Sequence, residues 1–175
     1  MNNIILIGYM GSGKTTVGKR LAEVFSVPKK YIFVDTDELI VQQQKRSINE
    51  IFATDGEAAF REMETELLKQ LIAKKSENMI LSTGGGMPVK EENRSLLSAL
   101  GTVIYLKASP QTIYTRIKDD TTRPLLQCEN PMAKITEMIA QRSPMYEAAA
   151  SIIIDTDKFS HFEVADEIIG RMKVR

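Results

Sequence analysis

The residues from Gly8 to Thr15 have the types and spacing of a phosphate-binding loop. They match the pattern G-x-x-x-x-G-K-[ST], and they directly follow the apolar run at residues 4–7. Glycines let the backbone curl so that its N–H groups point at phosphate oxygens, and the helix that follows adds partial positive charge. Lys14 supplies a full charge, and the Thr15 hydroxyl suits a magnesium ion that bridges the phosphates. The pattern predicts a nucleotide-phosphate site, with an ordinary glycine-rich turn as the alternative.

Polar residues and glycines follow two further predicted strands. Asp35 and Asp37 lie at the end of one, and Gly84, Gly85 and Gly86 follow another. Parallel sheets bind ligands at the carboxyl ends of their strands, so these residues should face the phosphate loop. If the chain is still extended there, the two carboxylates point to the same side. Alternatively, Asp37 caps a helix. Three glycines suit close approach of a ligand to backbone N–H groups, and a structural turn is the alternative.

Two arginines lie beside apolar helical stripes. Arg142 shares its stripe with Ile135 and Tyr146, and arginine is almost never buried unpaired. It should therefore meet an anion, either an internal carboxylate or the carboxylate of a ligand. Arg61 precedes Glu64 by three residues, and Glu64 lies on the apolar stripe of its helix. This pair is either a surface ion pair or a device in which Glu64 orients Arg61 toward an anionic substrate.

The order of apolar segments predicts an α/β fold. Short apolar runs alternate with longer segments of helical period, the pattern of a parallel sheet between two layers of helices. A capping box at Ser47 and Glu50, and Ser109 before Pro110, mark two helix starts. We expect strands at 3–8, 31–35, 79–82, 102–106 and 151–155, and helices at 14–25, 47–55, 57–75, 90–100, 110–118, 131–146 and 162–173.

Size and composition favour one domain over residues 1–175. The 23 basic and 23 acidic residues give no net charge, so we expect neither a nucleic-acid nor a membrane partner. Cys128 is the single cysteine, which fits a reducing compartment. A strand near the start leaves no room for a signal peptide, and no apolar run has the length of a membrane span. We therefore expect a cytoplasmic protein.

Residues 119–130 form the one long interval without apolar periodicity. Such intervals in compact domains are typically functional or mobile. We therefore place a lid at about residues 118–130.

In combination, these motifs resemble the shikimate kinase family. The resemblance implies a P-loop NTPase-type three-layer sandwich with a lid, built around a five-stranded parallel sheet of order 2-3-1-4-5. It also implies transfer of the γ-phosphoryl group of ATP to the 3-hydroxyl of shikimate, giving shikimate 3-phosphate and ADP, a step toward chorismate and the aromatic amino acids. The segments that carry the resemblance, in chain order, are Gly8–Thr15, Asp35–Asp37, Phe60–Glu64, Gly84–Gly86, Arg123–Leu126 and Arg142–Tyr146.

The resemblance also implies a role for single residues on the acceptor side. Arg61 and Arg142 hold the shikimate carboxylate, Asp37 holds the ring hydroxyls, and the backbone of Gly84–Gly86 lines the same pocket. The substrate-binding region spans approximately residues 37–62. Either Asp35 or Asp37 could accept the hydroxyl proton, and we expect Asp37 mainly to position the hydroxyl.

On the donor side, Lys14 contacts the β- and γ-phosphates, while Thr15 and Asp35 serve the magnesium ion. Arg123 resembles the lid arginine that moves onto the transferring phosphoryl group, and Arg116 belongs to the region that holds adenine. The implied catalytic set is thus Lys14, Asp35, Asp37 and Arg123. The other implied nucleotide contacts are Gly11, Ser12, Gly13 and Thr16.

Two alternative functions remain at this point. A related small-molecule kinase, such as a gluconate kinase, would share the fold and the loop but needs no pair of arginines aimed at one carboxylate. A nucleotide-dependent regulatory protein would keep the loop without catalysis. We expect a monomer, and we assign no role to His161, the only histidine.

Overall fold

The computed structural model describes residues 3–26, 30–120 and 128–173. At its centre is a parallel sheet of five strands in the order β2-β3-β1-β4-β5. This confirms the predicted fold class and strand order. The strands are β1 (Asn3–Ile7), β2 (Ile32–Asp35), β3 (Met79–Ser82), β4 (Gly101–Lys107) and β5 (Ile152–Asp155).

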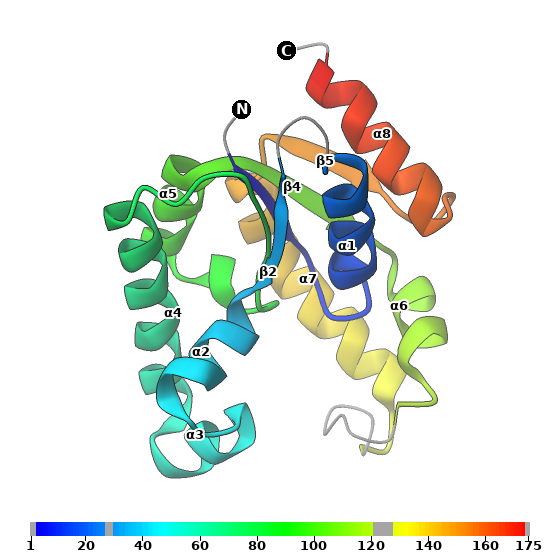
Figure 1. Cartoon of the computed structure of the whole chain (residues 1–175). Helices are drawn as coiled ribbons and strands as arrows, with labels where there is room; N and C mark the ends of the chain where they lie inside the picture. Colours follow the sequence, from blue (N-terminus) through cyan, green and yellow to red (C-terminus); the bar gives the residue numbers. More distant parts are fainter. Residues whose placement is uncertain (1–2, 27–29, 121–127, 174–175) are drawn as a thin grey trace.

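Helices connect the strands and cover both faces of the sheet (Figure 1). No helix within the described ranges is long and apolar enough to cross a membrane. The helices are α1 (Lys14–Val24), α2 (Thr36–Gln44), α3 (Ile48–Thr54), α4 (Gly56–Ala73), the 3-10 helix η1 (Met87–Val89), α5 (Glu91–Leu100), α6 (Pro110–Ile117), α7 (Pro131–Ala149) and α8 (His161–Lys173).

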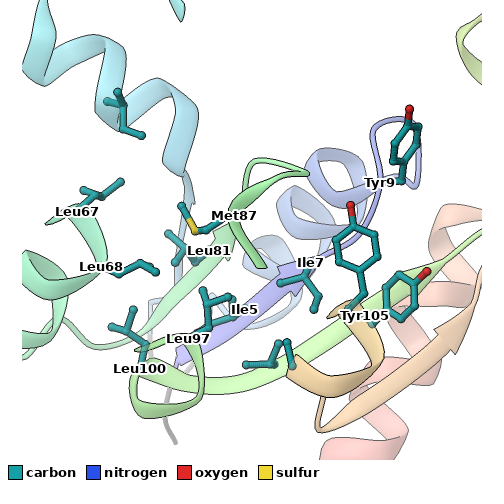
Figure 2. Close-up of a cluster of buried hydrophobic side chains, with 14 of the residues drawn as sticks. Ile5, Ile7, Tyr9, Leu67, Leu68, Leu81, Met87, Leu97, Leu100 and Tyr105 are labelled. Carbon is teal, nitrogen blue, oxygen red and sulfur yellow. The ribbon is translucent and has the colours of Figure 1, made fainter. Parts of the chain in front are cut away.

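The alternation of side chains along β1 divides the core into two layers. Ile4 and Leu6 point to the face that α1 and α8 cover. Ile5 and Ile7 point to the opposite face, where α4, α5 and α7 pack (Figure 2). All four side chains are fully buried. A strand that is apolar on both faces therefore fixes a three-layer arrangement with the phosphate loop emerging from its middle.

The capping box of Ser47 with Glu50 and the Ser109 cap are both confirmed. Sequence patterns did not predict α2, and Asp37 does not cap it. The cap is Asp35, whose Oδ1 accepts hydrogen bonds from the backbone N–H of Asp37 at 2.9 Å and of Glu38 at 3.5 Å. Since Thr36 already begins the helix, the two aspartates do not lie on one extended segment.

At the other end of the sheet, Asn3 joins three segments. Its Nδ2 donates to the carbonyls of Ser76 at 2.8 Å and Leu100 at 3.0 Å, and its Oδ1 accepts from the Met79 N–H at 3.0 Å. The residue is only 3% exposed. Its amide thus satisfies backbone groups that would otherwise be buried without partners.

We predict that Asn3→Ala lowers the free energy of unfolding by about 2–4 kcal/mol, because it orphans buried backbone groups. Its kcat at low temperature should stay close to that of the wild type, since Asn3 lies at the amino ends of the strands. Urea denaturation measures the loss. The control is Gln43→Ala, which removes an exposed amide that bonds to Gln70. A loss below about 1 kcal/mol for Asn3→Ala would contradict the assignment.

Candidate active site

The carboxyl ends of β1, β2 and β3 meet at one edge of the sheet. Leu6 pairs with Ser82, and the Leu6 carbonyl accepts from the Thr83 N–H at 3.1 Å and from its hydroxyl at 3.3 Å. The Gly84 N–H donates to the Thr36 hydroxyl at 3.0 Å. These bonds bring the phosphate loop, the Asp35–Asp37 segment and the triple glycine together, as the sequence predicted.

The phosphate loop has the backbone that its glycines allow. Gly13 is left-handed (φ 96°) and is the N-cap residue of α1, so the helix N-terminus opens directly onto the loop. The Lys14 ammonium donates to the carbonyls of Gly8 at 2.8 Å and Tyr9 at 3.0 Å, and so lies over the loop. Ser12, although a residue of the loop, is buried and does not line the cavity described next.

A cavity of about 510 Å³ lies against this loop, and we name it the phosphate-loop cavity. It collects most of the residues that the sequence assigned to the donor side, together with two aspartates and two glycines from the neighbouring strand ends. These predicted residues are Gly11, Gly13, Lys14, Thr15, Thr16, Asp35, Asp37, Gly84, Gly85 and Arg116.

Arg116 connects the phosphate loop to the end of β5. Its Nη1 donates to the Gly11 carbonyl at 3.2 Å and its Nη2 to the Thr156 carbonyl at 3.0 Å. His161, to which the sequence assigned no role, also lines the cavity and lies against Gly13, where a Cβ would meet its Cδ2 at 3.0 Å. The sequence could have indicated this position, because His161 follows the carboxyl end of β5 and the segments after other strands also contribute residues to the site.

A second cavity, of about 700 Å³, adjoins the first, and we name it the arginine cavity. It contains Arg61 and Arg142, as predicted, and also apolar residues that sequence reasoning missed, among them Phe52 and Met138. Nothing in the local sequence indicates that these apolar side chains line a cavity. They reach it because of how their helices, α3 for Phe52 and α7 for Met138, are placed in the fold. The residues common to both cavities are Met10, Asp37, Gly84 and Gly85.

Arg61 is held by two carboxylates of its own helix. Its Nη1 lies 2.8 Å from Glu64 Oε2, and its Nη2 lies 2.8 Å from Glu57 Oε1. The Glu64 side chain is completely buried, so the surface-pair interpretation is wrong for it. The pair instead fixes the direction of the guanidinium toward the cavity.

Arg142 has a different environment. It is half-buried, and its guanidinium carbon lies 5.9 Å from the centre of the Tyr9 ring. Among the ion pairs of the described residues, none joins Arg142 to a carboxylate. The carboxylate of a ligand stays a prediction for Arg142, which lines the arginine cavity.

Two buried carboxylate oxygens face the triple glycine. Asp37 Oδ1 and Glu64 Oε1 have no hydrogen-bond partner among the described residues, and a Cβ on Gly84 would lie 2.6 Å from the first and 3.0 Å from the second. Burial is the main cause that raises the pKa of Asp37 to about 6 and that of Glu64 to about 7. Hydroxyl groups of a ligand that enters the cavity are suitable donors for acceptors of this kind.

Arg123 and most of the predicted lid at 118–130 lie outside the described residues. The cavities therefore contain the predicted donor and acceptor residues except Ser12, which is buried, and Arg123. The geometry fits a two-substrate site: cations and helix N–H groups for phosphates on one side, arginines and carboxylates for a polyhydroxy acid on the other.

Comparison with known proteins identifies the family. The family model described as Shikimate kinase matches residues 10–173. The chain belongs to the shikimate kinase family. A shikimate kinase from Thermodesulfovibrio yellowstonii is 43% identical over 169 residues, which cover 97% of this chain and 94% of that relative. The family match decides for a shikimate kinase over a gluconate kinase.

Solved structures agree with this result. A shikimate kinase from Acinetobacter baumannii in complex with shikimate has a TM-score of 0.89 and 35% identity, over 99% of this chain and 94% of that one. A deoxyadenosine kinase from M. mycoides with bound dATP shares the fold alone, with a TM-score of 0.60 and 14% identity, over 98% and 99% of the two chains. The shikimate kinase fold is thus a variant of a wider kinase fold.

We predict that Gly84→Ala raises the KM for shikimate at least tenfold, because the new methyl group would displace both the Asp37 and the Glu64 carboxylate. Steady-state kinetics with coupled ADP detection measures the change. Gly170→Ala is the control, since a Cβ there has no neighbour within 4 Å. An unchanged KM for Gly84→Ala would show that neither carboxylate position matters for the acceptor.

The raised pKa of Glu64 predicts how stability depends on pH. Because its pKa is about 7 in the folded state against an ordinary 4.5, the stability that its protonated form contributes is fully present below pH 4.5 and is lost as the pH rises through 7. We expect Glu64→Gln to reduce the fall in Tm of the ligand-free protein between pH 5 and pH 7.5. Glu62→Gln, on the exposed side of the same helix, should keep the wild-type slope; equal slopes for all three proteins would contradict the prediction.

Proposed function

We propose that the γ-phosphoryl group of ATP passes to the 3-hydroxyl of shikimate where the phosphate-loop cavity meets the arginine cavity, which gives shikimate 3-phosphate and ADP. Family membership makes this chain an ATP-dependent kinase that phosphorylates shikimate. The observation that carries the proposal is the set of residues shared by both cavities, because a phosphoryl group must reach its acceptor without leaving the protein.

On the donor side, Lys14 lies over the phosphate loop at the N-terminus of α1 and offsets charge on the β- and γ-phosphates. The backbone N–H groups from Gly11 to Thr16 supply further donors, and Arg116 serves the adenine end. Arg123 stays a prediction from the resemblance, as the residue that offsets charge on the transferring group.

A magnesium ion fits the oxygen ligands that line the phosphate-loop cavity. Thr15 offers a hydroxyl and Asp35 a carboxylate, both of them hard oxygen ligands. Within the described ranges, no group of three or more His, Cys, Asp or Glu side chains could hold a metal ion. We assign Thr15 and Asp35 as the residues of this chain that would hold the ion together with ATP. When bound, it would neutralise charge on the phosphate oxygens.

On the acceptor side, Arg61 and Arg142 bind the shikimate carboxylate, and the Gly84–Gly86 backbone lines the pocket. Asp37 Oδ1, a buried acceptor with no donor among the described residues, accepts hydrogen bonds from the ring hydroxyls and orients the 3-hydroxyl toward the phosphates. A loose transition state needs little help from a base, so positioning is the main task of Asp37. Either aspartate remains able to take the proton.

Four wider expectations stay predictions from the sequence. These are one domain over residues 1–175, a substrate-binding region near 37–62 with a lid near 118–130, a monomer without nucleic-acid or membrane partners, and a cytoplasmic location.

We predict that Lys14→Met lowers kcat at least a hundredfold, because a full positive charge beside the transferring phosphoryl group is lost. ADP release is measured with and without shikimate. The control is Lys19→Met, which removes an exposed lysine of the same helix. Substantial turnover by Lys14→Met would refute the role of Lys14. Wild-type ADP release that shikimate does not increase would refute the proposed acceptor.

A further inference from the structure

Tyr146 of α7 is completely buried, but its hydroxyl lies at the active site. The hydroxyl donates to the Gly85 carbonyl with an oxygen–oxygen distance of 2.5 Å. A buried phenol needs a hydrogen-bond acceptor, and a carbonyl of an irregular glycine segment needs a donor. The bond therefore ties the triple glycine to the helix that carries Arg142.

Gly85 lies close to both this hydroxyl and the phosphate loop. A Cβ on Gly85 would be 3.8 Å from the Tyr146 hydroxyl, 3.4 Å from the Gly8 carbonyl oxygen and 3.6 Å from the Met10 nitrogen. The glycine segment thus packs against both the Tyr146 hydroxyl and the backbone of the loop. A shift of Tyr146 would change the position of the segment that separates the two cavities.

Tyr146 also contacts Arg142, which lies one helical turn before it. The positive charge of the Arg142 guanidinium lowers the pKa of Tyr146, against the larger effect of burial, which raises it to about 12. The phenol therefore keeps its proton and donates it to Gly85, which leaves a lone pair of its oxygen for a donor such as the guanidinium one helical turn away. The carbon of the same guanidinium also lies 5.9 Å from the centre of the Tyr9 ring.

We propose that Tyr146 is a positioning residue of the acceptor site, whose hydroxyl fixes the Gly85 carbonyl and the Arg142 guanidinium relative to each other before shikimate binds. The inference rests on the proposed roles of Arg142 and Gly84–Gly86. A free arginine side chain loses rotamer freedom when it binds a carboxylate, and a guanidinium that is already held loses less. Tyr146 therefore acts on acceptor affinity, through two groups that touch the acceptor.

The test compares Tyr146→Phe with Tyr105→Phe. Each substitution removes one hydroxyl from a buried tyrosine of the same ring pair, whose centroids are 5.1 Å apart. The Tyr105 hydroxyl interacts with Ser143 rather than with the glycine segment or Arg142, so it is a matched control. Tm and far-UV circular dichroism establish that both variants are folded at an assay temperature of 15 °C, and kinetics are measured for both substrates.

We expect Tyr146→Phe to raise the KM for shikimate about tenfold, with kcat and the KM for ATP within twofold of the wild type, and Tyr105→Phe to leave all three within twofold. An unchanged KM for shikimate in Tyr146→Phe, an equal rise in Tyr105→Phe, or an equal loss of ATP affinity would overturn the proposal. The wild type tests the proposed function separately, because that function fails only if shikimate does not stimulate its ADP release.

A second variant tests the path through Arg142. If the phenol acts partly by holding that guanidinium, Tyr146→Phe should raise the KM for shikimate by a smaller factor in an Arg142→Lys background than in the wild type. Shikimate-induced shifts in Tm give the same comparison without turnover. If Tyr146→Phe raises the KM for shikimate by the same factor in the Arg142→Lys background as in the wild type, the assigned action through Arg142 is wrong.

Discussion

The register between β1 and β3 is the constraint on which the site depends. The Leu6 carbonyl accepts hydrogen bonds from both the N–H and the hydroxyl of Thr83. Thr83 is the residue after Ser82, the last paired residue of β3, and Leu6 lies two residues before the phosphate loop begins at Gly8. A slip of one residue would exchange the side chains that β1 presents to its two helix layers and would move the triple glycine away from the loop. Since β1 is apolar on both faces, the packing of both helix layers opposes such a slip, and fold stability and site geometry have the same origin.

The two halves of the site differ in how deeply their charged groups are buried. In the donor half, Lys14 lies over backbone carbonyls of the loop, and the N-terminus of α1 opens onto the same loop. Both the ammonium and the helix N-terminus line the phosphate-loop cavity, where phosphate can reach them. The acceptor half buries Glu64 against Arg61, and one oxygen each of Glu64 and Asp37 has no donor in the part of the chain that the structure describes. Burial of such groups is unfavourable unless a ligand completes their hydrogen bonds. In the acceptor half, these oxygens would be satisfied by a ligand that brings hydroxyl donors to them, while a ligand carboxylate suits the arginines.

Sequence patterns predicted the features that depend on local chemistry. The phosphate loop, the five strands, the two helix caps and the position of Arg142 on an apolar stripe follow from residue type and spacing over a few residues. The cap at Asp35 and helix α2 were missed, because only Thr36 and Ile40 of that helix are buried and its apolar signal is weak. The position of His161, the burial of Glu64 and the bond from Tyr146 to Gly85 depend on contacts between distant segments. Arg123 is known from its motif only.

The packing of the chain's later segments against the phosphate loop has a consequence for the order in which the site forms during synthesis. The loop occupies residues 8–15, yet Gly13 lies against His161, and Arg116 joins Gly11 to Thr156. A ribosome therefore releases the phosphate-binding motif early and the residues that surround it late. The nascent chain therefore carries the motif without its neighbours from β5 and α8 until residues 156–161 have emerged, and only then can these contacts around the nucleotide site form.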